Sequence, residues 1–108
     1  GLFEHTRKDQ ELARLYSTYP SLDQSFLKAL FKRHGLLVYT LLKTVKTSKD
    51  LGQDFGAGLT ETEILYFIQQ EWACTAEDVL WRRTKCGLHM SIEQRQAVEH
   101  YFTEITHR

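Results

Sequence analysis

The chain has 108 residues, which suffices for one small globular domain and leaves no room for a second. Hydrophobic residues make up 42% and charged residues 26% of the sequence, ordinary values for a folded domain that exclude a disordered tail. Lys plus Arg and Asp plus Glu number 14 each, so no net charge attracts nucleic acid or anionic lipid.

The first eight residues are polar and mixed, and the chain starts with Gly-Leu-Phe in place of an initiating methionine. We therefore expect residues 1–8 to be the poorly ordered remnant of a linker, cut from a longer protein. From Asp9 onward, apolar residues recur at i, i+3, i+4 and i+7, the spacing of one helix face: Leu12, Leu15, Tyr16 and Tyr19. This pattern predicts an amphipathic helix that the only proline, Pro20, closes.

A second and a third helix are predicted before residue 46. Ser21 with Gln24 has the form of a capping box and opens the second helix, for which Gly35 is the predicted stop. The third helix contains the apolar residues Val38, Leu41, Leu42 and Val45. Because Leu36 and Leu37 make its start apolar on more than one side, we expect this helix to lie at the centre of the core.

Residues 46–59 are predicted to form the one long irregular connection, with three glycines that permit tight turns. Residues 50–61 place Asp at positions 1 and 5 and Glu at position 12, as a calcium-binding loop does. The match fails because position 3 is Gly52, which has no ligating side chain, and position 6 is not the required glycine. We therefore predict no metal site and interpret this stretch as a shaped connection.

Residues 61–88 are the most informative run and predict two helices joined by a short corner. Thr60 with Glu63 has the capping-box form and starts the first of these helices. Its apolar stripe, and the two residues that end it, are Ile64, Leu65, Ile68 and Trp72, then Ala73 and Cys74. Thr75 then restarts the helix, and Gly87 is its predicted left-handed stop.

The charges of this second helix follow the helix dipole. Glu77 and Asp78 stand in its first turn, and the last turn is basic, with Arg82, Arg83 and Lys85. Asp78 and Arg82 are spaced i, i+4 and should pair, at about 0.3–0.5 kcal/mol if exposed. We expect one of the two arginines to pair within the domain and the other to reach another domain. The acidic first turn would repel a phosphate backbone, so we predict no nucleic-acid partner.

The last predicted helix starts at Ser91 with Gln94, a further capping box, before the apolar residues Val98, Tyr101, Phe102 and Ile105. With four such helix starts and no alternating strand pattern, the predicted fold class is all-α. We expect a compact bundle of about five or six short helices with orthogonal or antiparallel packing around one core.

No catalytic, cofactor-binding or metal-binding group is predicted from the residue types. The chain has only two cysteines, twelve positions apart, which indicates buried thiols in a reducing compartment, and neither has the CxxC partner typical of a metal site. His100 and Glu104 share a helix face, but two ligands fall short of a zinc site. Trp72 and Trp81 are interpreted as core residues. No apolar run approaches the roughly 20 residues of a membrane span, so we expect a soluble chain. Together with the reducing compartment that the cysteines indicate, the expected location is cytoplasmic.

A family resemblance is carried by two runs, DLGQDFGAGLTE at residues 50–61 and EWACTAEDVLWRRTKCGL at residues 71–88. Together they resemble the C-terminal helical domain of FAD-dependent (aerobic) glycerol-3-phosphate dehydrogenases, and the resemblance extends more loosely from about Tyr19 to the end. In that family the flavin fold, with its glycine-rich dinucleotide loop, and the substrate-binding residues lie in a larger preceding domain. The resemblance therefore implies FAD in the parent protein and no cofactor in this fragment.

The resemblance implies that residues 9–108 are a non-catalytic cap or docking domain. Its parent would oxidise glycerol 3-phosphate to dihydroxyacetone phosphate, reduce quinone, and lie peripherally on the inner face of the cytoplasmic membrane. The expected partner is the N-terminal flavin domain of the same chain, and a homodimer stays open. The candidate inter-domain or structural residues are Asp50, Asp54, Phe55, Trp72, Asp78, Trp81, Arg82 and Arg83.

Three questions stay open at this point. One alternative is the oxygen-using oxidase branch of the same family, because the electron acceptor is chosen in the flavin domain. Another is a free-standing helical adaptor that binds a partner helix in a groove. Finally, residues 1–50 hold nine basic and five acidic side chains and residues 51–108 hold five and nine, giving +4 and −4. We expect these charges to interleave on the surface, with a dipolar molecule as the alternative.

Overall fold

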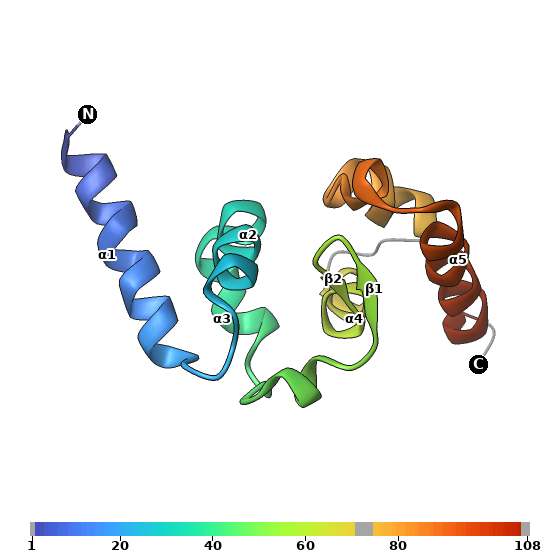
Figure 1. Ribbon diagram of the computed structural model, residues 1–108, viewed down its shortest axis with the longest axis horizontal. Helices are drawn as coiled ribbons and strands as arrows, with labels where there is room; N and C mark the ends of the chain where they lie inside the picture. Colours follow the sequence, from blue (N-terminus) through green and yellow to red (C-terminus); the bar gives the residue numbers. More distant parts are fainter. Residues whose placement is uncertain (1, 71–74, 107–108) are drawn as a thin grey trace. The chain divides into compact units, whose positions relative to one another are not determined.

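The computed structural model describes residues 2–70 and 75–106 (Figure 1). Over these residues it is mostly helical, with five α-helices and one short two-stranded hairpin. The predicted all-α class and the predicted number of helices are therefore confirmed, and the hairpin is an addition. The chain divides into two units, Gly1–Asp50 and Leu51–Arg108, each of which is described by itself.

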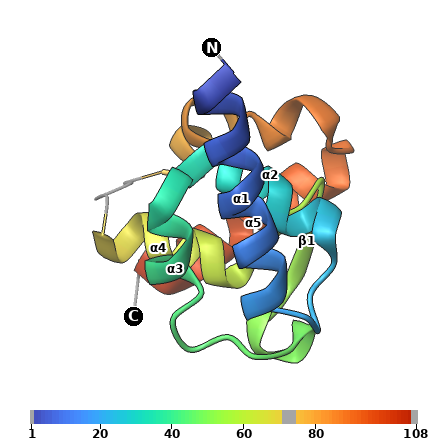
Figure 2. The same ribbon diagram turned by 90° about the vertical axis from the view of Figure 1, so that its left-hand side faces the viewer.

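The first unit is built on two helices that contact each other; they are neighbours in Figure 1, and one crosses in front of the other in Figure 2. They are α1, Leu2–Thr18, and α2, Gln24–His34. The predicted start of the first helix at Asp9 is wrong, because α1 begins at Leu2. Its end before Pro20 is confirmed. The buried side chains of this unit are Leu15, Leu22, Leu27, Leu30, Val38, Leu41, Leu42 and Val45.

The first turn of α2 is capped by Asp23 and not, as predicted, by Ser21. The Phe26 amide donates a hydrogen bond of 3.0 Å to Asp23 Oδ2. Asp23 directly precedes the helix and has the extended backbone of a capping residue (φ −62°, ψ 132°), so its carboxylate reaches an amide that the helix leaves unpaired. A carboxylate at this position also interacts favourably with the positive end of the helix dipole.

Replacing the cap separates the two assignments. Asp23→Ala is expected to lower the free energy of unfolding by about 0.5–2 kcal/mol, because the Phe26 amide loses its acceptor. Ser21→Ala, the matched control at an exposed position, is expected to change it by less than about 0.5 kcal/mol. Urea unfolding followed by far-UV circular dichroism measures both. A larger loss of stability for Ser21→Ala than for Asp23→Ala would contradict the Asp23 cap and support the predicted capping box of Ser21 with Gln24.

The predicted third helix is much shorter than its apolar pattern. Gly35 ends α2 with a positive φ of 59°, as predicted, and the chain continues as a 3-10 turn, Gly35–Leu37. Only then does α3 follow, Val38–Leu41. Leu36 and Leu37 remain 62% and 51% exposed, so their predicted place at the centre of the core is wrong. The 3-10 turn uses up the residues that would have begun a longer α-helix, and burial starts only at Val38.

The second unit begins at Leu51, the last residue of a 3-10 turn, Ser48–Leu51, and the antiparallel hairpin follows. Its strands are β1, Asp54–Gly56, and β2, Leu59–Thr60, with an irregular register between the pairs Asp54–Thr60 and Gly56–Leu59. The two turn residues both have positive φ, 52° at Ala57 and 80° at Gly58, as tight hairpin turns require. Strands this short leave no alternating pattern to predict from.

Helical segments make up the rest of the second unit. They are α4, Glu61–Gln70; a helical stretch at residues 76–77 that continues as a π-helix, Asp78–Arg83; a 3-10 turn, Cys86–His89; and α5, Ile92–Thr106. The predicted end of the first of these helices, at Ala73 and Cys74, lies outside the described residues. The apolar side chains buried in this unit are Leu51, Phe55, Leu59, Ile64, Tyr66, Phe67, Ala76, Val79, Leu80, Cys86, Met90, Val98 and Phe102.

The two predicted capping boxes of this unit have different outcomes. At α5 the box is complete, because the Ser91 amide donates to Gln94 Oε1 at 3.0 Å and the Gln94 amide donates to Ser91 Oγ at 3.1 Å. At α4 the predicted box is wrong. Thr60 belongs to β2, and its buried hydroxyl has no hydrogen-bond partner among the described residues.

Candidate docking surface

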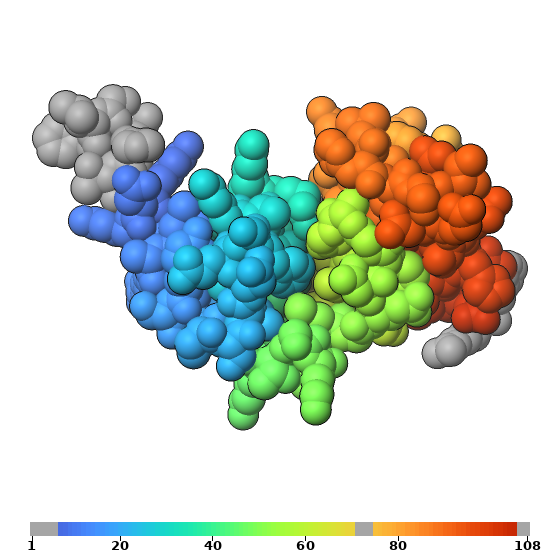
Figure 3. Space-filling model, viewed as in Figure 1, coloured from blue at the N-terminus to red at the C-terminus, as the bar shows by residue number. Residues whose placement is uncertain are grey.

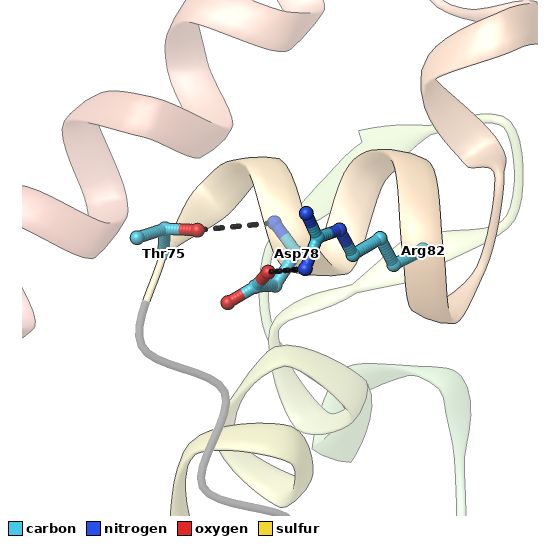
Figure 4. Close-up of polar contacts among 3 residues, drawn as sticks. All are labelled: Thr75, Asp78 and Arg82. Carbon is cyan, nitrogen blue, oxygen red and sulfur yellow. Dashed lines mark hydrogen bonds and ion pairs between the residues drawn. The ribbon is translucent and has the colours of Figure 1, made fainter.

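The helical segment that contains the π-helix starts at Thr75, as the sequence predicts. The Asp78 amide donates to Thr75 Oγ1 at 3.1 Å, so Thr75 caps the helical segment (Figure 4). Arg82 Nη1 lies 3.7 Å from Asp78 Oδ1, which confirms the predicted i, i+4 pair. The Arg82 side chain is 83% exposed, so solvent screens this pair and it contributes little to stability.

The segment ends differently from the prediction. The amide and the hydroxyl of Thr84 both donate to the carbonyl of Val79, at 3.1 and 2.7 Å, which closes a ring of five residues in place of four. The chain then reverses at Lys85, whose φ is 58°, and not at Gly87, which is not among the residues of positive φ. The predicted left-handed stop at Gly87 is therefore wrong.

Gly87 serves close packing instead. A Cβ on Gly87 would lie 3.0 Å from Cη2 and Cζ2 of Trp81, so the indole rests against the backbone of the 3-10 turn. On α5, the guanidinium carbon of Arg95 lies 5.7 Å from the centre of the Trp81 ring, a cation–π distance. Trp81 is nevertheless 38% exposed, which corrects its predicted place in the core. Trp72, the other predicted core tryptophan, lies outside the described residues.

Trp81 forms one wall of a hollow of 440 Å³ on the second unit, which is also lined by Thr75, Ala76, Glu77, Glu99, Phe102 and Thr103. Arg82 and Arg83 are exposed on the same π-helix. Tryptophan and arginine are the residue types that contribute most to protein interfaces, since they combine large contact area with several hydrogen-bond donors. We define Trp81, Arg82, Arg83 and Arg95 as the Trp81 surface.

The other predicted site residues stabilise their own turns. The Asp50 carboxylate accepts the amides of Lys46 and Thr47 at 2.9 and 3.1 Å, and these hydrogen bonds lower the pKa of Asp50. Asp54 Oδ1 accepts the Gly56 amide at 2.8 Å. Both carboxylates thus cap backbone turns of a kind that Asp favours. In the described part of the chain, no three His, Cys, Asp or Glu residues are grouped so that they could hold a metal ion.

Phe55 fastens the hairpin to α5. Its side chain is only 3% exposed, and its ring meets the edge of Tyr101 at a centroid distance of 5.3 Å. The Tyr101 hydroxyl donates to Glu61 Oε2 at 2.7 Å, while Glu61 Oε1 accepts the Gln53 amide at 3.0 Å. The stretch 50–61 is therefore held in one shape by α4 and α5, as predicted for a shaped connection.

Sequence reasoning missed Glu61 and Tyr101, which join segments 40 positions apart. It also missed Thr84, whose hydroxyl accepts the Cys86 amide at 3.0 Å in addition to its bond to Val79. The glycines were the available signal, because Gly52 has a φ of 76° and lies directly against Glu61. Cys86 is buried, as predicted, and Cys74 lies outside the described residues.

Two further observations concern an exposed His–Glu pair and membrane crossing. His100 Nε2 and Glu104 Oε1 lie 3.0 Å apart on one exposed face of α5, as the sequence predicts. None of the helices formed by residues 2–70 and 75–106 is long and apolar enough to cross a lipid bilayer.

Comparison with known proteins covers nearly the whole chain. Residues 4–107 match the family model described as the C-terminal domain of alpha-glycerophosphate oxidase. The chain is 36% identical over 99 residues to the aerobic glycerol-3-phosphate dehydrogenase of Escherichia coli strain K12. The aligned residues cover 92% of this chain and 20% of that protein. It is 38% identical over 96 residues to the glycerol-3-phosphate dehydrogenase of Pseudomonas aeruginosa, covering 88% and 19%.

A third relative carries a different substrate in its name. The D-erythritol 1-phosphate dehydrogenase of Brucella abortus is 33% identical over 88 residues, covering 82% of this chain and 18% of that protein. The chain thus spans about one fifth of the length of the curated relatives that it matches. Because the family match extends over residues 4–107, this chain belongs to the family of C-terminal domains of alpha-glycerophosphate oxidase and is homologous to the C-terminal region of aerobic glycerol-3-phosphate dehydrogenase.

Proposed function

We propose that this chain is the non-catalytic C-terminal cap and docking domain of an FAD-dependent glycerol-3-phosphate dehydrogenase. The observation that carries the proposal is the match over 92% of this chain to only 20% of a glycerol-3-phosphate dehydrogenase. A domain that recurs as a small part of such an enzyme takes its function from the larger part. The parent would oxidise glycerol 3-phosphate to dihydroxyacetone phosphate and pass the electrons to quinone.

The described residues do not fit FAD. A dinucleotide is held by a parallel strand, a glycine-rich turn and a helix N-terminus, and the two strands here form only a short antiparallel hairpin. At Gly52, the space beside the backbone is filled by the Glu61 carboxylate, which would repel a pyrophosphate. We therefore assign the flavin and the chemical step to the preceding domain and derive no step through it here.

Docking would use the Trp81 surface and the hairpin. Trp81 is partly exposed although its ring rests on Gly87 and Arg95, so a rigid aromatic side chain is presented without loss of order on binding. Exposed Arg82 and Arg83 carry planar guanidinium groups, and each can form two parallel hydrogen bonds with a carboxylate of a partner domain. The partner in this proposal is the flavin domain of the same polypeptide, in the cytoplasm and peripheral to the inner face of the membrane.

The test compares this chain with the longest natural protein that contains it. We expect the longer protein to show the visible bands of oxidised flavin and to reduce a dye when glycerol 3-phosphate is added. The 108-residue chain should show neither property. A longer protein without flavin would contradict the proposal and favour a free-standing helical adaptor.

The electron acceptor and the substrate need separate measurements. The family description names an oxidase, so hydrogen peroxide formation is measured beside quinone reduction. One relative is named for D-erythritol 1-phosphate, so that compound is compared with glycerol 3-phosphate. We expect quinone reduction with glycerol 3-phosphate to dominate. Peroxide formation at an equal or higher rate would identify the oxidase branch.

A further inference from the structure

A groove lies between α1 and α2 in the first unit, apart from the Trp81 surface. Its volume is 570 Å³. Side chains of the two helices form one continuous surface in the space-filling view (Figure 3). The apolar lining consists of Leu12 and Phe31, both half-buried, and of Leu36, which is 62% exposed at the end of the groove.

The rim of the groove is basic. Lys8 lies on α1 and Lys28 and Lys32 lie on α2, where the i, i+4 spacing puts both on the same helix face. Glu11 is the one acidic residue among the lining side chains. Among the described side chains, none of these three lysines has an ion-pair partner. The groove therefore combines an apolar floor with a lining that carries three positive charges and one negative charge.

We propose that this groove binds an amphipathic helix of a partner protein, with an apolar stripe flanked by Asp and Glu. The apolar stripe would replace water over Leu12, Phe31 and Leu36, and the flanking carboxylates would face the lysines. Charge complementarity selects an acidic helix over a neutral or basic one, because a lysine-flanked helix would meet three like charges. This inference goes beyond the proposed function and does not depend on it.

Two other occupants fit the geometry less well. A lipid surface is broad and would touch the protruding Leu36, but it would not reach the half-buried floor at Leu12 and Phe31. On a second copy, the apolar faces of α4 and α5, as far as these helices are described, are already covered. On α4 the apolar face is already buried at Ile64 and Phe67, and on α5 it is buried at Val98 and Phe102.

A synthetic helix of about 18 residues, with leucines at i, i+3, i+4 and i+7 and glutamates on both flanks, serves as the probe. Binding is measured by fluorescence anisotropy, and the site is mapped by backbone amide chemical shifts. Lys28→Glu with Lys32→Glu is expected to weaken binding by about tenfold or more, because two attractive contacts become repulsive. The same variant should bind a probe with lysines in place of glutamates more tightly than the parent chain does.

The matched control is Lys43→Glu with Lys49→Glu. These lysines are exposed, belong to the same unit and give the same change in net charge, but they do not line the groove. Binding should change by less than about twofold, because salt screens the effect of charges that lie outside the groove. Leu36→Ser tests the apolar part at an exposed position, where folding does not depend on the side chain, and should also weaken binding.

Three outcomes would overturn the proposal. The first is that the acidic helix does not bind at all, and the second is that both charge-reversed pairs weaken it equally. The third is that vesicles of phosphatidylglycerol bind the chain and the helix does not, which would identify a membrane surface. In each case the flavin measurement on the longer protein is unaffected, so failure here is distinguishable from failure of the proposed function.

Discussion

Phe55→Ala is expected to lower the free energy of unfolding of the second unit by about 3–5 kcal/mol. The ring is 3% exposed and packs against the edge of Tyr101, so its removal loses both the burial of an aromatic side chain and the neighbours around it. The cavity would lie between the hairpin and α5. Both tryptophans of the chain belong to residues 51–108, so urea unfolding followed by tryptophan fluorescence reports on this unit.

Phe55→Leu is the control, because it keeps most of the volume and removes only the aromatic edge contact. A loss of about 1–1.5 kcal/mol is expected for this variant. If Phe55→Ala cost less than about 1 kcal/mol, the phenylalanine would not be buried in solution and the hairpin would not be fixed to α5.

Gly52→Ala should cost about 2–4 kcal/mol. Two separate causes contribute. The φ of 76° is unfavourable for any residue with a Cβ, and the added Cβ would lie 2.8 Å from Cβ of Glu61 and in contact with its carboxylate. Displacing Glu61 would also strain its hydrogen bonds to the Gln53 amide and the Tyr101 hydroxyl.

Gly58→Ala separates the two causes. Its φ of 80° is nearly the same as that of Gly52, but a Cβ there would have nothing within 4 Å. This variant should therefore show the backbone cost alone, about 1–2 kcal/mol. Equal losses for the two alanine variants in the same urea experiment would mean that the Glu61 side chain moves away without cost.

The local capping rules succeeded at two helix starts and failed at two others, for different reasons. Ser91 with Gln94 and Thr75 with Asp78 are confirmed, because their hydrogen bonds span only three residues and need no distant partner. Ser21 was a worse choice than Asp23, which directly precedes α2. Thr60 was wrong because a strand, stabilised by a pairing that the sequence pattern does not show, occupies the capping position.

Burial and helix type depended on contacts beyond the local pattern. Leu36 and Leu37 look like core residues in sequence, but Gly35 turns the chain into a 3-10 segment that leaves both exposed. Trp81 is partly exposed, and its two partners, Gly87 and Arg95, lie on a later turn and on α5, outside the helix from which a core position was predicted. No helix periodicity distinguishes such a position from a core position.

For the candidate docking residues, the sequence predicted local chemistry better than assembly. The Asp78–Arg82 pair is confirmed, and the family that the run 71–88 indicated is the family to which the chain belongs. The contacts of Asp50, Asp54, Phe55, Trp81 and the two arginines with another domain stay a prediction, since such contacts require a partner. That the charges of residues 1–50 (+4) and 51–108 (−4) interleave on the surface also stays a prediction.

The five-residue ring closed by Thr84 on Val79 has a consequence for how this segment tolerates changes of length. Deletion of one residue between them would restore the ordinary four-residue ring of an α-helix. The residues left between Val79 and Thr84 would then point in new directions around the helix axis, because an α-turn spaces successive residues differently from the wider π-turn. Trp81 would leave the position in which it rests against Gly87. Homologues that keep the same surface must therefore keep the number of residues in this turn, even where its amino acids are exchanged.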